Sequence, residues 1–139
     1  MDFLLANAHS ENHRWTIVTA HHPISSASSE GYSHAGEGPL GEFLRRFVCG
    51  KPDVWISGHA HHLEHRRIPG CKTELIVSGG GGGELKPVVE SKDSLFARST
   101  FGFAEFEVNE DSIETRFFDA NAQELYHTTF TKPLDPSTP

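Results

Sequence analysis

Two short apolar segments, each followed directly by histidine, constrain the fold of this chain most strongly. Trp15–Ala20 and Asp53–Ser57 are β-branched, apolar runs of the kind found in strands covered on both faces. Between them, residues 39–48 predict a helix, with Pro39 near its start and Gly50 after its end. A strand, a helix and a second strand in this order form a crossover, and a crossover joins parallel strands.

The remainder of the chain predicts an antiparallel arrangement. Residues 63–68 and 73–78 read as strands around a Pro69-Gly70 turn. After a polar stretch, three alternating segments separated by turn signals follow, at 102–108, 112–118 and 125–131. The predicted fold class is therefore α/β, or α+β for this chain taken alone, with a short parallel βαβ part followed by an antiparallel meander. Residues 2–14 predict the end of an amphipathic helix.

Composition limits the partners that the chain can have. Lys and Arg number 12 against 19 Asp and Glu, and the net charge of −7 argues against non-specific nucleic-acid binding, which needs a basic surface. No apolar run approaches the roughly 18 residues of a membrane span, and the first residues lack the features of an export signal. Cys49 and Cys71 can pair or remain free, so they do not settle the redox compartment.

Histidines are the candidate ligands, because there are ten of them in 139 residues. Six lie in two clusters directly after the predicted parallel strands: His21, His22, His59, His61, His62 and His65. An H-x-H triplet alone is weak, since about 0.7 are expected by chance at this frequency. The clusters, however, follow the carboxyl ends of strands, where open α/β sheets bind ligands, and Gly58 permits a sharp turn before His59. We therefore expect His59 and His61 to ligate a metal ion.

Four segments resemble the calcineurin-like metallophosphoesterases, most closely their purple-acid-phosphatase branch. Residues 15–23 (WTIVTAHHP) are similar to the strand and G-H-x-P step of that family, with Ala20 in place of its glycine. Residues 56–61 (ISGHAH) resemble its G-H-x-H motif, and 75–81 (LIVSGGG) the strand and glycine turn that follow. Residues 101–108 resemble its closing antiparallel strands. The resemblance implies the C-terminal half of a four-layer α/β/β/α sandwich, with residues 1–132 as part of the domain and 133–139 as a disordered tail.

The resemblance also implies a role for each histidine. His21 and His59 would bind the second metal ion, and His61 the first. His34, in the long Ser/Gly loop, would lie near the substrate phosphate as a catalytic residue. His22 fills a variable position, so we expect it to pack or cap rather than ligate. The intact family site holds two divalent or trivalent ions (Fe, Mn or Zn), of which this chain alone would hold at most one firmly.

The carboxylate motifs of the family, D-x-H, G-D-x-x-D and G-N-H-[DE], do not occur in this sequence. In the family they precede the segment that matches Trp15. We therefore expect the chain to be the C-terminal half of a larger phosphomonoesterase or phosphodiesterase, nearly inactive alone, that acts on a small phosphorylated substrate. The strand edge at Ile17 would then be open to the missing N-terminal half or to a second copy. The resemblance favours an exported or periplasmic protein, although the chain carries no signal.

Two alternatives compete with this interpretation. One is a non-catalytic metal-binding or interaction module that uses the histidines for a single ion and the open edge for a partner. The other is a metallo-β-lactamase-like H-x-H-x-D-H site, but Leu63 stands where the aspartate belongs and Glu64 comes one place late. His62 and His65 would at most support the metal ligands, without binding the ion themselves. The glycine run at 79–83 is not a phosphate loop, because no Gly-Lys-[Ser/Thr] follows it.

Overall fold

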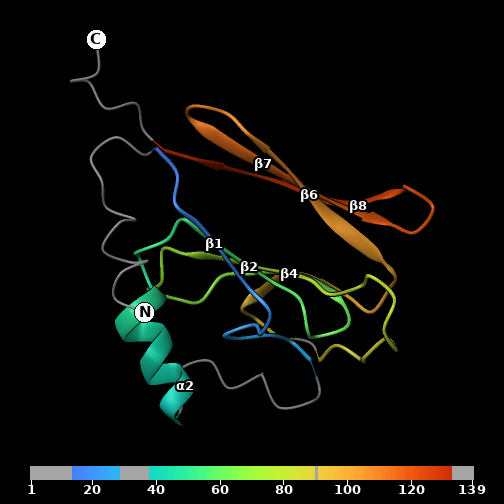
Figure 1. Ribbon diagram of the computed structural model, residues 1–139, viewed down its shortest axis with the longest axis horizontal. Helices are drawn as coiled ribbons and strands as arrows, with labels where there is room; N and C mark the ends of the chain where they lie inside the picture. Colours follow the sequence, from blue (N-terminus) through green and yellow to red (C-terminus); the bar gives the residue numbers. More distant parts are fainter. Residues whose placement is uncertain (1–13, 29–37, 90, 133–139) are drawn as a thin grey trace.

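The computed structural model describes residues 14–28, 38–89 and 91–132 (Figure 1). The strands are β1 (Ile17–Ala20), β2 (Val54–Ser57), β3 (Leu63–Arg66), β4 (Glu74–Ser78), β5 (Ser94–Arg98), β6 (Gly102–Val108), β7 (Ser112–Asp119) and β8 (Glu124–Thr131). The helix α2 (Gly38–Phe43) continues directly into a π-helical turn, η1 (Leu44–Val48). Of the expected helix at 2–14, only Arg14 is among the described residues. The expected disordered tail at 133–139 lies outside them.

The strands form two sheets. Five of them make a mixed sheet in the order β1-β2-β4-β3-β5, in which β1, β2 and β4 are parallel and β3 runs antiparallel to β4 and β5. The predicted meander is a separate antiparallel sheet of β6, β7 and β8. Figure 1 shows this second sheet across one face of the first, with α2 on the opposite side. The predicted α+β arrangement, parallel strands followed by antiparallel ones, is confirmed.

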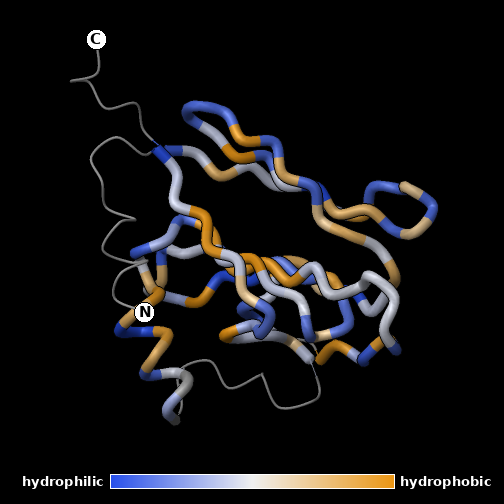
Figure 2. The backbone as a smooth tube through the Cα atoms, in the orientation of Figure 1, coloured by the Kyte–Doolittle hydropathy of each residue, from blue (hydrophilic) through white to orange (hydrophobic). Residues whose placement is uncertain are grey.

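Apolar side chains fill both spaces between these layers. Figure 2 shows that hydrophobic residues recur along the strands of both sheets. The core between the two sheets consists of Val54, Leu63, Ile76, Ile113, Phe117 and Phe130. The core between the first sheet and the helix consists of Ile24, Leu44, Val48, Trp55 and Leu75. The described residues thus form a helix layer and two sheet layers, three of the four layers that the sequence led us to expect.

Two features of the first sheet differ from the sequence prediction. Strand β5 lies in what the sequence presents as a polar stretch, yet it pairs with β3 and its Phe96 packs against the core between the sheets. Strand β1, expected to be covered on both faces, is exposed on one of them, where Ile17 is 38% exposed. It also lies at an edge of the described sheet, where the sequence analysis expected an open edge. The short apolar run therefore predicted a strand correctly but not the degree to which it is covered.

Cys49 and Cys71 form a disulfide, with their Cα atoms 4.8 Å apart. The bond joins the end of η1 to the turn between β3 and β4. The buried Thr73 reinforces this junction, because its hydroxyl accepts a hydrogen bond from Gly50 N at 3.1 Å and lies 2.8 Å from Pro52 O. The helix end is therefore fixed to the sheet covalently and by hydrogen bonds.

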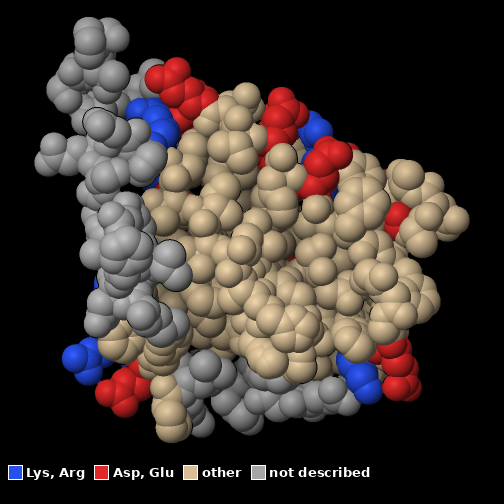
Figure 3. Space-filling model, in the orientation of Figure 1, with Lys and Arg blue, Asp and Glu red and all other residues tan. Residues whose placement is uncertain are grey.

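Charged side chains surround an uncharged centre on the face seen in Figure 3, with both signs interspersed around its edge. On β7, for example, Arg116 lies among Glu105, Glu107 and Glu114. Within the described ranges, no helix is both long and apolar enough to cross a bilayer.

Candidate metal centre

Three histidines meet where β1 and β2 end. His21 and His22 follow β1 directly, and His59 comes two residues after the last residue of β2. The two strands are parallel neighbours, with Ala20 paired to Ser57, so their carboxyl ends lie at the same edge of the sheet. Gly58 N donates a hydrogen bond to His21 O at 3.1 Å, which continues the strand pairing into the histidine segment. The topology thus brings together two of the predicted ligands, His21 and His59.

The rings of these histidines are close enough to share one ion. His59 Nδ1 lies 3.2 Å from His21 Nε2, and the ring centroids of His22 and His59 are 4.0 Å apart. One ligand nitrogen from each of the three lies within 4.8 Å of the others. Tetrahedral zinc with Zn–N bonds of about 2.0–2.1 Å separates its ligand nitrogens by about 3.4 Å. The residues present therefore fit a metal ion after small movements of the side chains.

The sharp turn before the G-H-x-H segment occurs at a different residue from the one predicted. His59 itself has a positive φ of 59°, whereas Gly58 does not. A Cβ added at Gly58 would meet only His21 O, at 3.9 Å, which is an ordinary contact. A non-glycine residue in the left-handed region costs about 1–3 kcal/mol, and such residues concentrate at functional sites. The backbone strain thus falls on His59, one of the predicted ligands.

His61 lies outside this group of three. Its Nδ1–H donates a hydrogen bond to Glu84 O at 2.7 Å, because a carbonyl oxygen can only accept. Its ring also packs against Gly83, where an added Cβ would lie 2.3 Å from Cε1. With the proton on Nδ1, the lone pair resides on Nε2, the state of a histidine ready to bind a metal ion.

The other candidate histidines have different surroundings. His34, the predicted catalytic residue, lies outside the described residues. His22 is exposed beside His21 and His59 rather than packed away. His62 and His65 are fully buried, where they contact Glu64 and Glu74 respectively. The structure thus places His22, which the sequence led us to expect to pack or cap, beside two of the predicted ligands.

Glu64 is a fully buried carboxylate that fixes the segment after the first histidines. It accepts hydrogen bonds from Ala27 N at 2.8 Å and Ser94 Oγ at 2.5 Å, and it lies 3.0 Å from His62 Nε2 and 3.3 Å from Arg66 Nη1. Burial alone would raise the pKa of Glu64, but the hydrogen bonds from His62, Ser94 and Ala27 outweigh it and lower the pKa. Glu64 is therefore ionised, and it holds the buried start of the Ser/Gly loop against the sheet.

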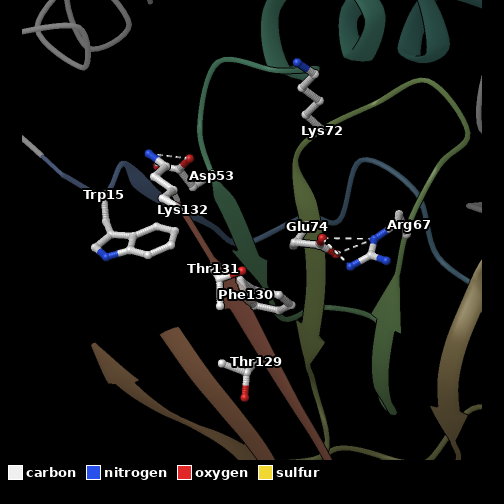
Figure 4. A pocket seen from close by; sticks show the side chains of 9 residues that line it. All are labelled: Trp15, Asp53, Arg67, Lys72, Glu74, Thr129, Phe130, Thr131 and Lys132. Atoms are coloured by element: carbon white, nitrogen blue, oxygen red, sulfur yellow. Dashed lines mark hydrogen bonds and ion pairs between the residues drawn. The ribbon is translucent and has the colours of Figure 1, made fainter. Parts of the chain in front are cut away.

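A cavity of about 280 Å³ lies at the end of the sheet opposite the histidines, where the parallel strands begin (Figure 4). It is lined by Trp15, Asp53, Arg67, Lys72, Glu74, Thr129, Phe130, Thr131 and Lys132. Both of its carboxylates are already paired, Asp53 with Lys132 at 2.7 Å and Glu74 with Arg67 at 2.6 Å. The Asp53–Lys132 pair therefore joins the two sheets at this end of the molecule, and neither carboxylate of the cavity is free for a metal ion.

Glu74 makes the stability of the fold depend on pH. Burial would raise its pKa, but hydrogen bonds from His65 and Arg67 outweigh burial, so the pKa of the folded state lies below the ordinary 4.5. The contribution of Glu74 is therefore present above about pH 4.5 and is lost as the pH falls through the lower folded value. We expect Glu74→Gln to lose less stability than the wild type between pH 5 and pH 3, measured by thermal denaturation. The exposed Glu124→Gln is the control, and equal acid sensitivity of Glu74→Gln and wild type would contradict the prediction.

Comparisons with known proteins give a consistent result. No family model matches the chain. Purple acid phosphatase 3 of Arabidopsis thaliana is 30% identical over 119 residues, which are 82% of this chain and 31% of the relative. The purple acid phosphatase PPD1 from yellow lupin seeds superposes with a TM-score of 0.74 at 21% identity, over 94% of this chain and 28% of that structure.

A second solved structure, GAP50, the anchor in the inner membrane complex of Plasmodium, superposes with a TM-score of 0.75 at 22% identity, over 98% of this chain and 42% of that structure. At such identities the two superpositions show a shared fold alone. The chain spans about a third of the length of the curated relatives it matches.

Proposed function

Because the chain belongs to the purple-acid-phosphatase branch of the calcineurin-like metallophosphoesterases, whose C-terminal part it matches, we propose that it supplies half of a metal-dependent phosphoric-ester hydrolase site. The approach of His59 Nδ1 to within 3.2 Å of His21 Nε2, at the carboxyl edge of the parallel strands, is the observation that supports this most directly. The substrate would be a small phosphomonoester or phosphodiester.

Three histidines would hold the ions in the complete site. His21 and His59 would share one ion, and His61 would offer Nε2 to a second, since Glu84 O already occupies its Nδ1–H. Iron, manganese and zinc all accept imidazole. When bound, a pair of such ions activates water and stabilises the charge on the phosphoryl group. We keep His34 as the candidate for a contact with the substrate phosphate.

The open edge of the first sheet is where the other half would join. Strand β1 pairs only with β2 among the described strands, and Ile17 and Thr19 are exposed along it. A strand from an N-terminal half, or from a second copy of this chain, would cover this edge. The carboxylate motifs that the sequence lacks would arrive with the N-terminal half, so the chain alone would bind at most one ion firmly and be nearly inactive.

The disulfide supports the expectation that the protein works outside a reducing compartment. Bonds such as Cys49–Cys71 persist in secreted and periplasmic proteins and are rare in the cytosol. We therefore propose an exported protein.

Turnover of p-nitrophenyl phosphate and bis(p-nitrophenyl) phosphate tests the proposed activity. We expect the 139-residue chain to give no turnover above buffer with iron, manganese or zinc. Joined behind the N-terminal part of Arabidopsis purple acid phosphatase 3, it should become active. In that fusion, His59→Ala should lower kcat by at least about 100-fold, since even supporting residues of a metal site are worth 10–100-fold, whereas the distant His127→Ala should have no effect. Metal-dependent turnover by the chain alone would refute its inactivity, and a folded, metal-loaded but inactive fusion would refute the enzymatic proposal.

A non-catalytic metal-binding module is the second candidate. It is favoured by one observation: among the described residues, no carboxylate joins the group formed by His21, His22 and His59. Such a module would bind a single ion that raises its thermal stability, and the fusion described above would remain inactive. A fusion that hydrolyses either ester excludes this alternative.

A further inference from the structure

His22 is close to both histidines that the proposed function assigns to one ion. Its ring centroid lies 4.8 Å from that of His21 and 4.0 Å from that of His59. We propose that His22 is the third protein ligand of a single-ion site formed with His21 and His59 within this chain. This inference rests on the proposed function, because it takes the other two ligands from it, but it adds a residue at a position that varies in the family.

The chemistry of the three side chains suits one ion. Three imidazoles and one water molecule complete a tetrahedral coordination shell, and zinc, cobalt and nickel all accept imidazole nitrogen. One nitrogen from each ring already lies within 4.8 Å of the other two, so small rotations of side chains that are exposed or only partly buried suffice to close them around an ion. The net charge of −7 on the whole chain favours the approach of a cation.

The backbone on either side of these rings is held in place. Ala20 and Gly58 are tied to the neighbouring strand end by sheet pairing and by the hydrogen bond from Gly58 N to His21 O. Pro23 is buried directly after His22, and four residues later Ala27 N is bonded to the buried Glu64. A site built on such anchored strand ends loses little entropy when the ion binds.

The proposed ligand set differs from the set that the family resemblance implies. His61 lies outside the group of three and packs against Gly83, with its Nδ1–H bonded to Glu84 O. In the absence of the carboxylate half of the site, His22 therefore takes the place that another ligand would fill. The two sets make opposite predictions about His22 and His61.

Titration of the 139-residue protein with Co²⁺ and with Zn²⁺ tests the inference, with Kd from competition against a chromophoric chelator and the stoichiometry from the cobalt absorption. We expect one ion per chain. His22→Ala should weaken binding by at least about 10-fold, whereas His61→Ala and the distant control His127→Ala should each change Kd by less than about threefold. Zinc should also shift the ring resonances of His21, His22 and His59 in ¹H–¹⁵N spectra, and no resonance of His127.

Each result has a clear meaning. Wild-type affinity in His22→Ala, with binding lost in His61→Ala, would overturn the inference and leave the ligands of the proposed function in place. A wild-type chain that binds neither Co²⁺ nor Zn²⁺ would also overturn the inference. The activity of the fusion protein tests the proposed function separately. His22 is exposed, so His22→Ala should keep the wild-type Tm. If it does not, His22→Gln removes the imidazole at nearly constant volume and must weaken binding to the same degree.

Discussion

The substitution Glu64→Gln should lower the free energy of unfolding by about 3 kcal/mol, which corresponds to a fall in Tm of about 10 °C for a domain of this size. Glu64 is fully buried, and its negative charge balances the neighbouring Arg66, which is 2% exposed. Glutamine keeps the shape but removes the charge, so Asp93, at 3.5 Å, would be the one ionic partner left to Arg66 among the described residues. The glutamine NH₂ group would also face groups that now donate hydrogen bonds to the carboxylate, including Ala27 N and Ser94 Oγ, so at least one of these hydrogen bonds would be lost.

Glu107→Gln is the matched control for this prediction. Glu107 lies on the outer face of β6, its side chain is 58% exposed, and it is 3.8 Å from Arg116. An exposed ion pair of this kind contributes at most about 1 kcal/mol, so the control should change stability only slightly. Urea denaturation of both variants measures the difference, and equal effects would mean that the buried network has no special role in stability.

Gly79→Ala should also destabilise the protein by about 3 kcal/mol and weaken metal binding with it, because the end of β4 packs on the backbone of the G-H-x-H segment. A Cβ added at Gly79 would lie 1.8 Å from Ala60 O and 2.8 Å from Ala60 C. Ala60 O accepts a hydrogen bond from His62 N at 2.8 Å, and Ala60 follows His59 directly. Relief of the clash must therefore move the residues that position His59 and His61.

Gly81→Ala, two residues along the same glycine run, is the control. Nothing lies within 4 Å of a Cβ added at Gly81, and its φ is not in the left-handed region. Its stability should stay within about 0.5 kcal/mol of wild type, as expected for a surface substitution. Chemical denaturation and the cobalt titration together measure both effects. If Gly79→Ala matched Gly81→Ala in stability and in Kd, the close packing of β4 on the histidine segment would be without consequence.

Most of the architecture could be predicted from patterns that are local in the sequence. Apolar runs and turn residues located seven of the described strands, because alternation and turn chemistry act over a few residues. Strand β5 was missed since Ser94–Arg98 contains two charged or polar residues at its ends and gains its place only by pairing with β3. The exposure of one face of β1 could not be predicted from its apolar run either, because it depends on which elements pack against that face.

The candidate site was predictable to a similar extent. His21 and His59 could be brought together by reasoning alone, because parallel neighbouring strands end at the same edge of a sheet. The closeness of the His22 ring to the His59 ring could not be predicted, since it depends on side-chain directions after the strand has ended. The burial of Glu64 was equally hidden, because a carboxylate in a strand gives no local sign that distant groups such as Ala27 N and Ser94 Oγ will neutralise it.

Because β1 lies at an edge of the described sheet, the proposed metal binding would be coupled to whatever covers that edge. The strand that leads into His21 is the same strand whose outer edge would accept a partner. A partner that binds this edge and steadies the end of β1 must, by thermodynamic linkage, bind more tightly when the ion is present. If the partner is a separate molecule, the apparent affinity for metal will rise with its concentration; if it is part of the same polypeptide, the affinity will be independent of dilution.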